Sequence, residues 1–172
     1  MNQRVFGITG WKNSGKTTLT ERLVALFTAQ GFRVATVKHA HHSFDIDREG
    51  TDSFRHRQAG AVETAIVSAH RWAVMHELRS KQEPQLSEIL QRLSPADLVL
   101  VEGYKNDSHP KIECRRAGAR DQSPLRGAIA NIVAIATEAP EAASAPPQFH
   151  IDDVGGIGAF ILKFLDLNSD GH

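Results

Sequence analysis

One segment, Gly10-Trp-Lys-Asn-Ser-Gly-Lys-Thr17, constrains the fold of this chain more than any other. It fits the pattern G-x-x-x-x-G-K-[ST], whose glycines let successive backbone N–H groups turn inward and surround a phosphate. Residues 4–9 before it are rich in Val, Phe and Ile, as in a buried strand. Residues 16–30 after it carry apolar side chains at helical spacing. This order of strand, loop and helix predicts a nucleotide-binding α/β unit.

The last two residues of the pattern predict how the phosphates and a metal ion are held. Lys16 is expected to reach the β- and γ-phosphates as a point charge. Thr17 is expected to place its hydroxyl oxygen on Mg²⁺, which prefers hard oxygen ligands.

Other apolar runs predict the rest of the fold. Residues 32–38, 97–102, 111–116 and 131–137 are typical of buried strands, and residues 63–69 and 71–78 are two further β-like runs. Helices are predicted at 51–59, at 85–93 and from a cap at Asp152 or Asp153 onward. The pattern predicts a three-layer α/β sandwich, with a mostly parallel sheet, helices on both faces and additional β-strands. The length of 172 residues and the lack of a repeat or linker favour one domain over 1–172.

Composition excludes several classes of protein. Lys plus Arg and Asp plus Glu both number 20, so no net positive field favours a nucleic-acid backbone or an anionic membrane. No window approaches the ~18 apolar residues that a membrane span needs. The single cysteine, Cys114, forms no internal disulfide and is predicted to be a small buried thiol. A reducing compartment, the cytoplasm, is the natural expectation.

Polar residues gather where the predicted strands end. Because parallel strands bring their carboxyl ends to one edge, residues after the strand 32–38 should lie beside the phosphate loop. The loop at 39–52, expected to be mobile, carries His39, His41 and His42, which suit phosphate or substrate contact, a solvated loop or a transition-metal site. Asp45 is slightly favoured over its neighbours as a Mg²⁺ ligand, against the alternative of a solvated carboxylate. Glu102, at the end of a strand, is expected at the same edge.

Five segments together resemble the MobB family: GWKNSGKTTL, KHAHHSFDID, GTDS, LVEGYK and PKIE. The resemblance implies a P-loop NTPase-like, homodimeric protein that binds GTP with Mg²⁺ and hydrolyses it weakly. It also implies that the protein assists a separate guanylyltransferase in attaching GMP to molybdopterin. Carried over residue by residue, it implies Lys16 and Glu102 as catalytic groups and Asp45, Glu102 and Thr17 near Mg²⁺, with Lys38 and His39 facing nucleotide or pterin. The phosphate-binding residues that it implies are Gly10, Lys12, Asn13, Ser14, Gly15, Lys16, Thr17 and Thr18.

Two features of a GTPase are not evident in the sequence. The guanine-reading motif Asn-Lys-x-Asp is absent, and Thr137 with Glu138 is the expected substitute, because a carboxylate there would accept from the guanine N1–H and N2–H₂ groups. Arg48 and Arg55 flank the loop that is expected to be mobile, and arginines at 115, 116, 120 and 126 lie far along the chain from the phosphate loop. An arginine acting on the charge that develops at the γ-phosphate is therefore expected to arrive by loop closure or from a second subunit.

Two other functions stay open on the sequence alone. A nickel-type metallochaperone GTPase is suggested by the three histidines, and tight stoichiometric binding of Ni²⁺ or Zn²⁺ would support it. A small-molecule P-loop kinase is suggested by the phosphate loop, and transfer of the γ-phosphate to an acceptor other than water would support it.

Overall fold

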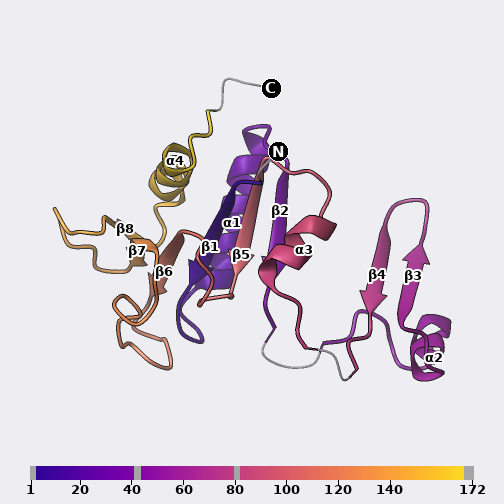
Figure 1. The fold of residues 1–172 in the computed structure, drawn as a ribbon. Coiled ribbons are helices and arrows are strands. Elements are labelled where there is room, and N and C mark those ends of the chain that lie inside the picture. The colour runs from indigo at the N-terminus through magenta and orange to yellow at the C-terminus, as the bar shows by residue number, and fades with distance from the viewer. Residues whose placement is uncertain (1–2, 41–43, 80–81, 169–172) are drawn as a thin grey trace. The chain divides into compact units, whose positions relative to one another are not determined.

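The chain divides into two compact units (Figure 1). A computed structural model describes residues 3–40, 44–79 and 82–168. The first unit comprises Met1–His39 and Leu86–His172, and the second comprises Ala40–Gln85. The single nucleotide-binding domain expected from the sequence stays a prediction.

The first unit is built on a six-stranded sheet in the order β2-β5-β1-β6-β7-β8. All of its neighbouring strands pair in parallel. Parallel sheets need cover on both faces, and accordingly all four residues of 98–101 are fully buried. The strands are β1 (Val5–Thr9), β2 (Val34–Lys38), β5 (Leu98–Glu102), β6 (Lys111–Arg115), β7 (Ile132–Thr137) and β8 (Gln148–His150).

Helices cover both faces of this sheet. On one face α1 (Lys16–Ala29) and α4 (Val154–Phe164) pack their apolar residues into a single core with Phe6 and Ile8 of β1. On the other face α3 (Leu86–Arg92) buries Leu86 against Val99 and Val101. The predicted α/β class, with a mostly parallel sheet and helices on both faces, is confirmed.

The predicted elements are present, with bounds that differ by a few residues. The predicted cap of the last helix is confirmed, because the Asp153 side chain accepts a hydrogen bond from the Gly156 N–H at 2.9 Å. Cys114 is buried, and this burial raises the pKa of its thiol to about 12, as expected of a structural cysteine. Strand β8 was missed: it has three residues and follows a segment rich in Ala and Pro.

The connection from β5 to β6 contains no helix. It runs from 103 to 110 and brings His109 against Gly7 of β1, where a Cβ would lie 2.6 Å from the His109 Nε2. Both ring nitrogens of His109 are buried, and neither has a hydrogen-bond partner among the described residues. Burial, with a smaller contribution from the charge of Lys111, lowers the pKa of His109 to about 4. The folded protein therefore holds this imidazole in its neutral form.

We expect His109 to make the free energy of unfolding depend on pH. The pKa is about 4 in the folded protein against an ordinary value of 6.5, so the unfolded chain binds the proton more readily. This contribution is complete above about pH 6.5 and is lost as the pH falls toward 4. After allowance for solvent screening it amounts to about 1–2 kcal/mol. Urea titrations at pH 7.5 and 4.5 should show a smaller difference for His109→Leu than for the wild type.

A matched variant separates this effect from general acid destabilisation. His150 has a side chain that is 50% exposed, so His150→Leu should keep the pH dependence of the wild type. An unchanged pH dependence in His109→Leu would contradict the assignment.

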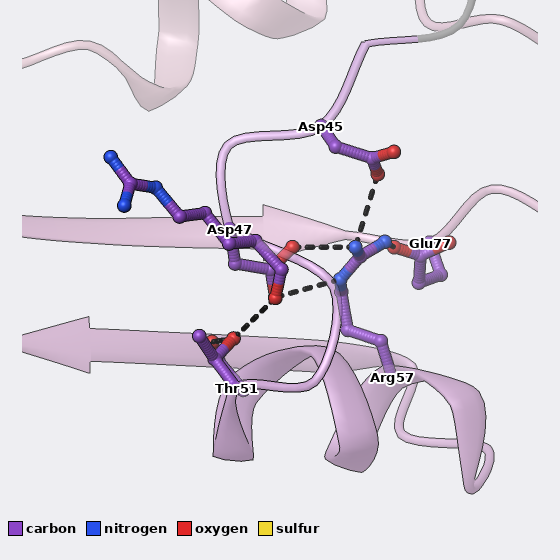
Figure 2. A network of polar contacts seen from close by, with 7 residues as sticks. Asp45, Asp47, Thr51, Arg57 and Glu77 are labelled. Carbon is purple, nitrogen blue, oxygen red and sulfur yellow. Dashed lines mark hydrogen bonds and ion pairs between the residues drawn. The ribbon is translucent and has the colours of Figure 1, made fainter.

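The second unit consists of α2 (Asp52–Gln58) and an antiparallel hairpin of β3 (Glu63–Val67) and β4 (Trp72–His76). Its centre is the guanidinium of Arg57, which Figure 2 shows between three carboxylates. Arg57 donates to Asp47 at 2.5 and 3.2 Å, to Glu77 at 2.8 Å and to Asp45 at 3.0 Å. These bonds join α2 to the segment before it and to the end of the hairpin.

None of the described helices is both long enough and apolar enough to cross a membrane.

Candidate nucleotide-binding site

The loop between β1 and α1 adopts a conformation that requires its glycines. Gly10 and Gly15 have φ values of 147° and 90°. A Cβ at Gly10 would lie 2.6 Å from the carbonyl oxygen of Cys114 on β6. Helix α1 begins directly after Gly15, at Lys16. A glycine-rich turn that leads directly into the N-terminus of a helix is the arrangement that binds phosphate through backbone N–H groups.

Two polar side chains of this loop have a chemistry that fits an anion. The Ser14 hydroxyl is buried and has no hydrogen-bond partner among the described residues. Lys16 donates from its Nζ to the carbonyl oxygen of Trp11 at 2.7 Å, within its own loop. Burial lowers the pKa of Lys16, although the charge of Glu102 acts in the opposite direction. A partly desolvated cation of this kind gains from a bound anion.

Strand β5 brings Glu102 to the phosphate loop. Because β5 pairs with both β1 and β2, Glu102 at the end of β5 lies in register with Ile8 of β1 and Lys38 of β2. Thr17 Oγ1 donates to the Glu102 carboxylate at 3.1 and 3.2 Å. The Lys38 Nζ lies 3.6 Å from Glu102 Oε1. A hydroxyl and a carboxylate in contact are oxygen donors of the kind Mg²⁺ prefers.

His39 continues the pairing of β2 with β5 by one residue. Its N–H donates to the carbonyl oxygen of Glu102 at 2.8 Å. Its ring contacts Tyr104 with the ring centroids 4.7 Å apart. Gly103 has a φ of 99°, and a Cβ there would lie 2.6 Å from the Cβ of His39. His39 and Lys38 thus lie next to Glu102, as the sequence predicted for two residues at the end of this strand.

A segment after β6, residues 116–123, lies against the phosphate loop, and we call it the strap. The indole Nε1 of Trp11 donates to the carbonyl oxygen of Ser123 at 2.8 Å. The N–H of Arg120 donates to the carbonyl oxygen of Lys12 at 3.1 Å. At Gly15, a Cβ would lie 3.0 Å from Cδ and 3.7 Å from Nη1 of Arg116. Arg116 therefore lies at the phosphate loop within the same chain, because β6 adjoins β1. The expectation that an arginine acting on the γ-phosphate arrives by loop closure or from a second subunit stays a prediction.

Glu138 has partners of its own at the end of β7. Its Oε2 accepts from the N–H of Ala117 at 2.8 Å, and its Oε1 accepts from the Nε of Arg116 at 3.2 Å. These bonds hold the pKa of Glu138 below its usual range. The hydroxyl of Thr137 accepts from the N–H of Ala139 at 3.5 Å. The base-reading role of Thr137 and Glu138 stays a prediction.

A cavity of about 280 Å³ lies between the strap, Trp11 of the phosphate loop and the end of β7. Its lining includes Arg116, Asp121 and Glu138. The cavity has room for a base and a ribose, and it offers both donors and acceptors.

Other residues predicted to act at the site belong to the second unit or lie outside the described residues. Asp45 belongs to the second unit and accepts a hydrogen bond from Arg57, so its assignment to Mg²⁺ stays a prediction (Figure 2). His41 and His42 lie outside the described residues, as does part of the loop 39–52. Within 3–40, 44–79 and 82–168, no group of three or more His, Cys, Asp or Glu residues could hold a metal ion.

Comparison with known proteins decides the family. The family model described as "MobB: Molybdopterin guanine dinucleotide synthesis protein B" matches residues 5–138, from β1 to the residue after β7. This chain belongs to the MobB family. The MobB match therefore includes the phosphate loop, Glu102, the strap and Glu138.

Individual MobB relatives agree with this assignment. The molybdopterin-guanine dinucleotide biosynthesis adapter protein of Escherichia coli is 34% identical over 157 residues, which cover 90% of this chain and 89% of the relative. The protein of the same name from Haemophilus influenzae is 38% identical over 144 residues, with coverage of 81% and 79%. The crystal structure of a MobB protein homolog from Bacillus stearothermophilus has a TM-score of 0.70 and 30% identity, with coverage of 94% and 97%.

Proposed function

We propose that this chain is a GTP-binding adapter protein that assists a guanylyltransferase in forming molybdopterin guanine dinucleotide. The observation that carries the proposal is the phosphate loop with Glu102 in contact with Thr17, in a member of the MobB family. The relatives from E. coli and H. influenzae are named adapter proteins of molybdopterin-guanine dinucleotide biosynthesis. Such a role requires nucleotide binding more than rapid turnover.

The ligand of the loop is GTP with Mg²⁺. The unpartnered hydroxyl of Ser14 and the desolvated Lys16 support a phosphate at the loop. Thr17 and Glu102 would hold Mg²⁺ directly or through its waters, and the ion would neutralise phosphate charge. Lys38 and His39, next to Glu102, would face the nucleotide or the pterin. Hydrolysis by the isolated protein is slow, because rapid phosphoryl transfer needs a positioned water and an added positive charge at the γ-phosphate.

The protein acts as a homodimer. On the hairpin of the second unit, Val67 pairs with Trp72 and Ala65 with Val74, so these side chains share one face. Val67 and Trp72 are 74% and 69% exposed. A two-stranded hairpin is marginally stable alone, and a second copy would cover this apolar face. The proposed compartment is the cytoplasm, where Cys114 stays reduced.

The adapter role is tested by cofactor analysis of a strain that lacks this protein. We expect guanylated molybdopterin to fall by about tenfold or more while unguanylated molybdopterin accumulates, because the guanylyltransferase loses its assistance. The wild-type gene should restore guanylation, and a Lys16→Ala gene should not. Loss of both forms of the cofactor, or a normal level of the guanylated form, would contradict the proposal.

A further inference from the structure

Arg116 occupies a position that the proposed function does not explain. It follows β6, and its side chain covers Gly15, the residue before the lysine of the phosphate loop. Its Nη1 would lie 3.7 Å from a Cβ at Gly15. Among the described residues, the two terminal nitrogens of the guanidinium have no hydrogen-bond partner, and 39% of the side chain is exposed. Terminal N–H groups beside a phosphate loop are suited to a phosphate oxygen.

Glu138 fixes the direction of this guanidinium. It accepts from the Nε of Arg116 at 3.2 Å and from the backbone N–H of Ala117 at 2.8 Å. Both carboxylate oxygens therefore have a partner within the protein. A carboxylate engaged in this way orients Arg116 and is poorly placed to accept two further hydrogen bonds from a guanine edge.

The order of the strands indicates which phosphate groups Arg116 can contact. Glu102 and Lys38 lie at the ends of β5 and β2, on one side of β1. A Mg²⁺ ion held by Thr17 and Glu102 would bring the β- and γ-phosphates to that side. Arg116 follows β6, on the other side of β1, and lines the cavity of about 280 Å³. The phosphates nearest to a nucleoside in that cavity are those that GTP and GDP share.

We propose that Arg116 is a nucleotide-binding residue that contacts a phosphate common to GTP and GDP, and that Glu138 is a positioning residue that aims it. This inference rests on the proposed function, because it assumes that the loop binds a guanine nucleotide. It assigns Glu138 a role different from reading the base. It also makes Arg116 a residue for binding, and not the cation that accelerates hydrolysis at the γ-phosphate.

The test measures the affinities of the full chain for Mg-GTP, Mg-GDP and Mg-ATP by calorimetry. We expect Arg116→Gln to weaken GTP and GDP binding by the same factor, about tenfold or more, because a charge-assisted hydrogen bond is lost from both. Arg120→Gln is the matched control: it removes one exposed arginine from the same strap, and it should change both affinities less than about twofold. Arg116→Lys, which retains the charge, replaces the glutamine variant if that variant does not fold.

The Glu138 variant distinguishes a positioning role from a base-reading role. Glu138→Gln should weaken GTP and GDP equally and leave the ratio of GTP to ATP affinity unchanged. Combined with Arg116→Gln it should cause no further loss, because Glu138 acts through Arg116. A collapse of the GTP-to-ATP ratio, or new binding of xanthosine triphosphate, would show that Glu138 reads the base and would overturn the assignment.

Two results would overturn the role of Arg116 and leave the proposed function intact. One is unchanged affinity for both nucleotides in Arg116→Gln, and the other is weaker binding of GTP alone. Failure of the wild-type protein to bind any of the three nucleotides would instead refute the proposed function.

Discussion

The substitution Lys16→Ala should weaken binding of Mg-GTP by about 100-fold or more while the protein stays folded. Lys16 begins α1, and its Nζ donates to the carbonyl oxygen of Trp11 in the phosphate loop. Among the described residues, its loss removes no side-chain hydrogen bond to another strand or helix. The substitution removes the positive charge that is directed at the phosphates. A 100-fold loss of affinity corresponds to about 2.8 kcal/mol of binding free energy. Calorimetric titration with Mg-GTP measures the loss, and thermal unfolding followed by circular dichroism confirms the fold.

Lys163→Ala provides the control for this result. Lys163 lies in the last turn of α4 and is exposed, so its loss removes the same net charge from the molecule. It should leave the affinity for Mg-GTP within about twofold. Equal affinity of Lys16→Ala and the wild type for Mg-GTP would refute the phosphate site.

The second large effect is expected from Arg57→Ala, which removes the centre of the second unit. The Asp47 side chain is only 2% exposed, and Arg57 supplies two of its hydrogen bonds. Arg57 also holds the pKa of Asp47 below its usual range. Its removal leaves a buried carboxylate uncompensated, which is strongly destabilising. Hydrogen exchange of the backbone amides in β3 and β4 should accelerate by about tenfold or more, while amides in β1 and β5 keep their rates.

Arg55→Ala is the matched control for the second unit. Arg55 lies in the same short helix, its side chain is 74% exposed and its nearest carboxylate oxygen, on Asp52, is 3.9 Å away. In Arg55→Ala, the backbone amides of β3 and β4 should exchange at the same rates as in the wild type. If Arg57→Ala and Arg55→Ala gave the same rates, the hydrogen bonds of Arg57 would not be what stabilises this unit.

Local sequence was sufficient to predict the elements and the phosphate loop. The apolar period of 16–30 and the pattern ending at Thr17 both depend on neighbouring residues. Strand β8 was missed because three residues are too few to show a period. The position of Glu102 was expected, because parallel strands end at one edge.

The remaining features of the site depend on contacts between distant segments. The hydrogen bond from Trp11 to Ser123 joins residues 112 positions apart, and neither segment has a local sequence pattern that predicts it. Arg116 is far from the phosphate loop along the chain, and only the order of strands, with β6 beside β1, brings it close. In the same way, Asp45 accepts a hydrogen bond from Arg57 on α2, and no sequence pattern around Asp45 indicates this partner.

The position of β5 between β1 and β2 has a consequence for the newly made chain. Within the described six-stranded sheet, β2 pairs with β5 alone, and β1 pairs with β5 and β6. Both β5 and β6 follow the second unit in sequence. At about 5–20 residues per second, translation needs several seconds to deliver β5 after β2. During that interval Phe6, Leu19 and Leu23 have no sheet on which to complete their core. The phosphate loop is thus synthesised early, but the strands that pack beside it are synthesised late. A chaperone would be most useful to the nascent chain during this interval.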